Sequence, residues 1–243
     1  HRDLHSFPTR RSSDLSLNMN VLPHYLSFFQ RNFLADRSTR WGIFPTLHHA
    51  KDNNDFNFAA LDLLSVRYLL IPTTGMPARL KSLATEKFPR LFESPAVTVV
   101  ENQTALPRAY LVSSLVHSAT TPGEKGLWAR NFAFTEDEVL LKHAAEAGID
   151  TFTTLPNPKQ NNAQSPNIPD IAVELKVIEN SVIKARIETD RPAVFVLSDA
   201  FHPNWRAFGN SREIYVGRVN EAFRGVVVEA GVTQLELRYE PRT

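Results

Sequence analysis

The alternation of apolar and polar residues beyond Pro169 is the feature that most restricts how this chain folds. Two stretches carry an apolar residue at every second position: Ile171, Val173, Leu175 and Val177, then Ile183, Ala185 and Ile187. A period of two places these side chains on one face of a β-strand. The segment 193–197 is apolar throughout, which predicts a central strand.

Further strands are predicted at 214–216, 223–228 and 235–239, where short β-prone runs are separated by Gly and Asn turns. Short strands that recur about every 8–12 residues are typical of sandwiches and jelly rolls. We therefore expect residues 170–243 to form an all-β sandwich, jelly-roll-like in kind.

The preceding part of the chain mixes helical and strand patterns. Helices are predicted at 22–35, 55–64 and 76–86, and strands at 66–71, 96–101 and 109–115. A further helix is predicted with Thr135 as its N-cap, Glu138 three residues on, and Gly148 as its stop. Residues 16–153 are thus expected to be a truncated α/β module, which makes the whole chain α+β.

Two segments are expected to lie outside the folded units. The segment 154–169 holds four prolines with Asn and Gln and almost no apolar residues, which indicates a linker. Residues 1–15, HRDLHSFPTRRSSDL, resemble a translated sequencing adapter, so we treat them as artefactual and expect the natural start to be missing. No run approaches the ~20 apolar residues that cross a bilayer, so the polypeptide as it stands is expected to be soluble.

Charge and cysteine content narrow the function classes. Without the three Arg and two Asp of residues 1–15, the 27 basic and 26 acidic residues fall to 24 each. A neutral chain without a basic cluster lacks the electrostatic attraction that dominates nucleic-acid binding, so no nucleic-acid partner is expected. The absence of cysteine excludes disulfides, thiolate zinc sites and a cysteine nucleophile.

Ordered segments of the chain resemble the C-terminal extracytoplasmic part of the bacterial YfhO-type membrane protein family. They are LDLLSVRYLLIP at 61–72, VTVVENQTALPRAYLV at 97–112, VLSDAFHPNW at 196–205, FRGVVVEAG at 223–231 and LELRYEP at 235–241. The family's usual Pro-Gly-Trp stands here as Pro203-Asn204-Trp205. The resemblance implies a polytopic glycosyltransferase that takes sugars from a lipid-phosphate carrier, with its chemistry in loops between spans upstream of this region.

Asp199, His202, Trp205 and Arg206 are the candidate ligand-binding residues, since they cluster where a predicted central strand ends. A carboxylate, an imidazole and an indole can together hold a sugar. The competing interpretation is that Asp199 caps a turn and Trp205 belongs to the core. An acid–base role of Asp199 with His202 is a further alternative.

No catalytic residue, metal site or cofactor is expected, because the chain has no nucleophile elbow, no His-Glu-x-x-His and no phosphate-binding glycine motif. His48 and His49 are adjacent, so their side chains diverge and a solvated loop is the better interpretation. Three arginines in or beside apolar strands, Arg67, Arg108 and Arg224, are expected to pair with Asp62, Glu101 or Glu221.

The resemblance implies an accessory region, structural or glycan-recognising, of a membrane protein at the extracytoplasmic face of the bacterial cell membrane. Its expected partners are a cell-envelope glycan or lipid-linked sugar, and the membrane through flanking helices. One alternative is a secreted carbohydrate-binding β-sandwich module, and another is a soluble enzyme with an unfamiliar site.

Overall fold

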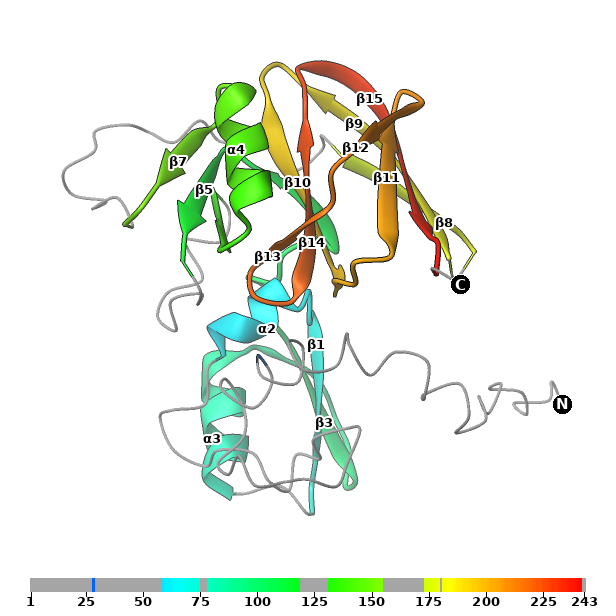
Figure 1. Cartoon of the computed structure of the whole chain (residues 1–243). Coiled ribbons are helices and arrows are strands. Elements are labelled where there is room, and N and C mark those ends of the chain that lie inside the picture. Colours follow the sequence, from blue (N-terminus) through cyan, green and yellow to red (C-terminus); the bar gives the residue numbers. More distant parts are fainter. Residues whose placement is uncertain are drawn as a thin grey trace, which may run out of the picture.

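The fold is mostly β, with a few short helices, several antiparallel sheets and one small parallel sheet (Figure 1). The computed structural model describes residues 28, 58–74, 78–118, 131–154, 173–179 and 181–241. The adapter-like residues 1–15, His48 and His49, and nearly all of the predicted helix 22–35 and linker 154–169 lie outside these ranges. Phe28, which is helical and 1% exposed, packs edge-on against Phe223.

A three-stranded antiparallel sheet with two helices forms the lower part of Figure 1. Its elements are α2 (Ala59–Leu63), β1 (Tyr68–Pro72), α3 (Ala78–Lys87), β2 (Arg90–Glu93) and β3 (Val97–Glu101), with the strands in the order β1-β3-β2. The predicted α/β module has helices beside a sheet in this part of the chain. It does not alternate helix and strand throughout, because β2 and β3 are consecutive antiparallel strands. Ser94 closes that return by accepting hydrogen bonds from the backbone N–H groups of Ala96 and Val97.

The predicted strand 109–115 is in fact two strands that belong to different sheets. β4 (Ala109–Val112) pairs with a strand from the C-terminal part of the chain, and β5 (Ser114–His117) is the central strand of a small parallel sheet. In that sheet β5 lies between β6 (Phe132–Thr135) and β7 (Asp150–Phe152). Helix α4 (Glu138–Glu146) connects β6 to β7.

The start of α4 differs from the prediction. Asp137, not Thr135, is the N-cap, and its carboxylate accepts a hydrogen bond from the Leu140 N–H. Thr135 ends β6, and its hydroxyl donates to the Arg218 carbonyl. Gly148 follows the C-terminus with a φ of +81°, the left-handed conformation expected of a glycine stop.

Two larger antiparallel sheets form the upper part of Figure 1. The four-stranded sheet has the order β13-β14-β10-β4, with β10 (Ala193–Ala200), β13 (Gly217–Val219) and β14 (Phe223–Val228). The five-stranded sheet has the order β12-β11-β15-β9-β8, with β8 (Val173–Glu179), β9 (Val182–Thr189), β11 (Trp205–Gly209), β12 (Arg212–Ile214) and β15 (Gly231–Tyr239).

One hydrophobic cluster joins the inner faces of these two sheets. Phe195 and Leu197 of β10 meet Ile187 of β9 and Leu235 and Leu237 of β15, all fully buried. The alternating pattern of β9 puts Ile183, Ala185 and Ile187 into this core, as the period of two predicts. β4 precedes the Pro-rich segment 154–169 in the chain, so the four-stranded sheet takes strands from both sides of that segment.

Candidate functional site

Asp199 lies near the end of β10 and joins two arginines that are distant in the sequence. Arg108 binds it through both oxygens, with Nε 2.9 Å from Oδ1 and Nη2 2.8 Å from Oδ2. Arg224, from the neighbouring strand β14, places its Nη1 3.7 Å from the same Oδ2. The Asp199 carboxylate on β10 therefore links Arg108, which directly precedes β4, with Arg224 on β14.

Arg224 is the buried member of this group, since it is 5% exposed. Its Nε donates to the Ala200 carbonyl at 3.1 Å, and its guanidinium lies 3.6 Å from the centroid of the Trp205 ring. Its Nη1 has no hydrogen-bond partner within the described residues. Burial lowers the pKa of Arg224 to about 10, against the opposing attraction of Asp199.

His202 packs beside the same cluster. It is 7% exposed, and its ring meets Tyr239 edge-on at a centroid distance of 5.3 Å. Its Nδ1 accepts a hydrogen bond from the Asn204 N–H, which fixes Nδ1 as the deprotonated nitrogen. Burial, and to a lesser degree the charge of Arg224, lower the pKa of His202, so the neutral imidazole is favoured.

Trp205 and Arg206 are separated even though they are adjacent in the sequence. Trp205 lies opposite Tyr239 in the register of β11 with β15, and the two rings are 5.4 Å apart. Arg206 lies on the other face of β11, because successive residues of a strand point to opposite sides. There its guanidinium binds Glu213 at 2.8 Å and Glu240 at 2.9 Å.

We define the Asp199 cluster as Arg108, Asp199, Trp205 and Arg224. Within it the carboxylate oxygens are taken by arginines, and one face of Trp205 is covered by the Arg224 guanidinium. Such an arrangement ties strands together and leaves few polar groups to receive a ligand. Ligand binding by Asp199, His202, Trp205 and Arg206 therefore stays a prediction, with Arg206 set apart from the other three.

The predicted arginine pairings are met in one case of three. Arg67 binds Glu101 at 3.0 Å as expected, but its side chain is 65% exposed rather than buried. Arg108 and Arg224 face Asp199 instead of the partners predicted for them. The partners of Asp62 are neutral groups and not an arginine, since its carboxylate accepts hydrogen bonds from the Asn102 amide and the Thr104 hydroxyl.

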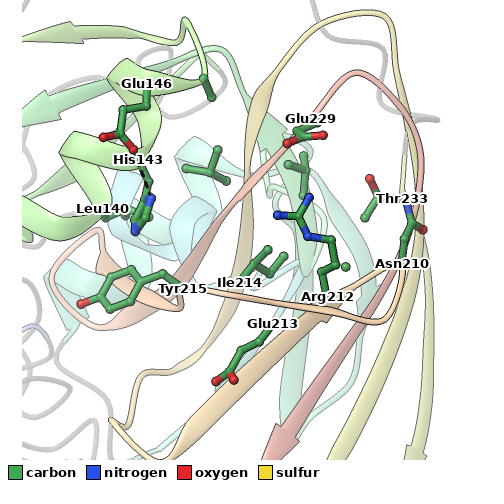
Figure 2. A pocket seen from close by; sticks show the side chains of 14 residues that line it. Leu140, His143, Glu146, Asn210, Arg212, Glu213, Ile214, Tyr215, Glu229 and Thr233 are labelled. Carbon is green, nitrogen blue, oxygen red and sulfur yellow. Dashed lines mark ion pairs between the residues drawn. The ribbon is translucent and has the colours of Figure 1, made fainter.

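A cleft of about 690 Å³ opens elsewhere, between α4 and the β12 side of the five-stranded sheet (Figure 2). Its lining includes His143 and Glu146 from α4, Arg212 from β12, Tyr215 from the segment that follows, and Glu229 from the turn before β15. No sequence motif marks these residues, because they come from separate elements and share no regular spacing.

Tyr215 is held rigidly at this cleft. Its hydroxyl donates to the Asp137 carboxylate, with Oη 2.9 Å from Oδ2, and its ring is 5.9 Å from that of His143. Burial, with the hydrogen bond to Asp137, raises the pKa of Tyr215 to about 12. The phenol therefore stays protonated at neutral pH and cannot act as a general base there.

Within the described ranges, no three His, Asp or Glu residues are grouped so as to hold a metal ion. In the same ranges, no helix combines the length and apolar character needed to cross a bilayer. Comparison with known proteins gives no match to a family model, to a curated protein or to a solved structure.

Proposed function

We propose that this chain is an extracytoplasmic accessory region, structural or glycan-recognising, of a YfhO-like, glycosyltransferase-type membrane protein of the bacterial cell envelope. The observation that carries the proposal is where the family-resembling segments meet. Arg108 comes from 97–112, Asp199 and Trp205 from 196–205, and Arg224 from 223–231, and all four belong to the Asp199 cluster.

The remaining resembling segments add contacts of the same kind. Tyr239, from 235–241, packs against both Trp205 and His202. Asp62, from 61–72, binds Asn102 from 97–112 through a buried hydrogen bond of 2.7 Å. The segments that carry the resemblance pack against one another, which supports reading the resemblance as a shared fold.

The Asp199 carboxylate is engaged by two arginines, Arg108 and Arg224, which supports an accessory rather than a catalytic role. A general base needs a group that is free to take a proton from substrate, and Asp199 accepts two hydrogen bonds from Arg108. In this proposal the sugar transfer belongs to loops between membrane spans of the parent protein. The finer fold assignment is an α/β module and a jelly-roll-like β-sandwich, whose two sheets share the Phe195 core and one of which includes β4 from the N-terminal part of the chain.

A secreted carbohydrate-binding module is the second candidate. The cleft beside α4 favours it, because its volume lies within the range of about 300–1,000 Å³ that is usual for small-molecule sites. Such a module would bind glycans without any membrane-embedded partner.

The experiment that tests the proposal is recovery and expression of the complete reading frame with a C-terminal tag. We expect the product in the membrane fraction after alkaline washing, and we expect external protease to cleave this region in intact cells. A short reading frame without membrane spans, with its product released into the medium, would overturn the proposal in favour of the secreted module.

A further inference from the structure

We propose that the cleft between α4 and β12 is the glycan site of this region and that it binds a short neutral oligosaccharide. The inference deepens the glycan-recognising form of the proposed function. It moves the site away from Asp199, His202, Trp205 and Arg206 to residues that the sequence did not single out. It concerns binding by this chain alone and requires no catalytic step.

Two unpaired charges in the lining indicate the ligand's chemistry. Arg212 and Glu229 are both exposed, and neither makes an ion pair or a side-chain hydrogen bond with a described residue. A guanidinium offers five N–H donors and a carboxylate only acceptors, so together they suit hydroxyls, which donate and accept. The Asp199 cluster differs in this respect, because its charged groups are already engaged with one another.

The balance of charge favours a neutral ligand over an anionic one. Glu213 is bound by Arg206, and Glu146 lies 3.8 Å from the Lys142 ammonium. With those carboxylates compensated, the unpaired charges that remain in the lining are one positive and one negative. A ligand rich in phosphate or carboxylate groups would be attracted by Arg212 but repelled by Glu229.

An aromatic surface lies at the α4 side of the cleft. Figure 2 shows His143 and Tyr215 on that side, with Arg212 and Glu229 on the opposite side. Tyr215 is 39% exposed, and the hydrogen bonds of its hydroxyl to Asp137 fix its orientation. A fixed aromatic ring can pack against the C–H face of a sugar while the charged pair binds its hydroxyls.

The test is calorimetric titration of the 243-residue chain with maltotriose and, separately, with chitotriose. We expect one of these neutral trisaccharides to bind. Arg212→Ala and Glu229→Gln should each weaken that binding about tenfold or more, since each removes a charged hydrogen-bonding group. Both positions are exposed and unpaired, so the melting temperature should stay at the wild-type value.

The matched control is Arg186→Ala, which removes an exposed arginine of the same sheet that binds Glu188 outside the cleft. It should leave affinity unchanged. The inference is overturned if neither trisaccharide binds, if Arg212→Ala and Glu229→Gln bind as the wild type does, or if a polyanion such as polyphosphate binds and the neutral sugars do not.

The two proposals fail separately. Membrane localisation of the parent protein without trisaccharide binding would end this inference and leave the structural form of the proposed function. Trisaccharide binding by a secreted product would end the membrane assignment and leave this inference standing.

Discussion

Replacement of Asp199 by asparagine tests whether the Asp199 cluster stabilises the fold. The change keeps the shape of the side chain but removes the negative charge that faces Arg108 and Arg224. Arg224 would then be a buried cation whose contacts are the Ala200 carbonyl and the Trp205 ring. Arg108 would lose less, because its side chain is 49% exposed and water can replace the carboxylate.

The expected loss follows from that asymmetry. Breaking a buried ion pair by removing one partner costs about 3–5 kcal/mol, whereas exposed pairs contribute about 0–1 kcal/mol. One partner of Asp199 is buried and the other is half-exposed, so we expect a loss at the lower end, about 3 kcal/mol. For a chain of this length, that loss lowers the melting temperature by roughly 6–12 °C.

Urea unfolding of a double-mutant cycle identifies the cause. Arg224→Met removes the buried charge itself, so Asp199→Asn combined with Arg224→Met should be more stable than Asp199→Asn alone by about 1–2 kcal/mol. The reasoning is refuted if Asp199→Asn unfolds within about 0.5 kcal/mol of the wild type. It is also refuted if the double variant is no more stable than the single one.

Three further predictions concern the neighbouring elements. The pKa of His202 is lowered in the fold from its ordinary value of 6.5, so the unfolded chain binds the proton more readily. The stability conferred by neutral His202 is therefore complete above pH 6.5 and is lost as the pH falls through the folded pKa. Urea denaturation at several pH values should show that the wild type loses stability relative to His202→Gln as the pH falls. A stability difference that does not change with pH would contradict this prediction. Asp137→Ala removes the cap of α4 and the acceptor of the Tyr215 hydroxyl, so thermal unfolding should show a loss of about 1–2 kcal/mol, and Asp137→Asn, which still caps, a smaller one. Gly217→Ala places a Cβ 2.9 Å from the Leu140 Cβ, so urea unfolding should show a loss of about 1–3 kcal/mol, and wild-type stability would mean that α4 yields to it.

The strands that the sequence predicts well are those with a regular apolar period. β8, β9 and the C-terminal strand β15 alternate, and the continuously apolar β10 is a central strand between β14 and β4. A strand buried on one face needs an apolar residue at every second position, and a strand buried on both faces needs a continuous apolar run. The sequence therefore predicts these strands directly.

Other strands are missed or misplaced, and in two regions the reason is that no regular apolar period is present. All four residues of β2 are exposed, so no alternation reveals it. The predicted strand 214–216 overlaps the structure only at Ile214, the last residue of β12. Tyr215 and Val216 lie between strands, and β13 begins at Gly217. Gly217 lies so close to Leu140 that any side chain there would collide with α4, and contact of this kind leaves no periodic trace.

The candidate ligand-binding residues lie together only in part, and their separation has specific physical causes. Asp199 and Trp205 do come together, but through Arg224, and the main partner of Asp199 is Arg108, 91 residues away. No spacing rule connects residues at that separation. Arg206 lies apart from Trp205 for a simpler reason, since neighbouring residues of the strand 205–209 point to opposite faces.

The pairing of β4 with β10 has a consequence for the order in which the chain becomes native during synthesis. Ribosomes add about 5–20 residues per second, so the 91 residues between Arg108 and Asp199 take roughly 5–18 s to emerge. The Asp62–Asn102 contact spans 40 residues and can form well before then. Until β10 arrives, the four residues of β4, all buried in the finished fold, remain open to water and to chaperones.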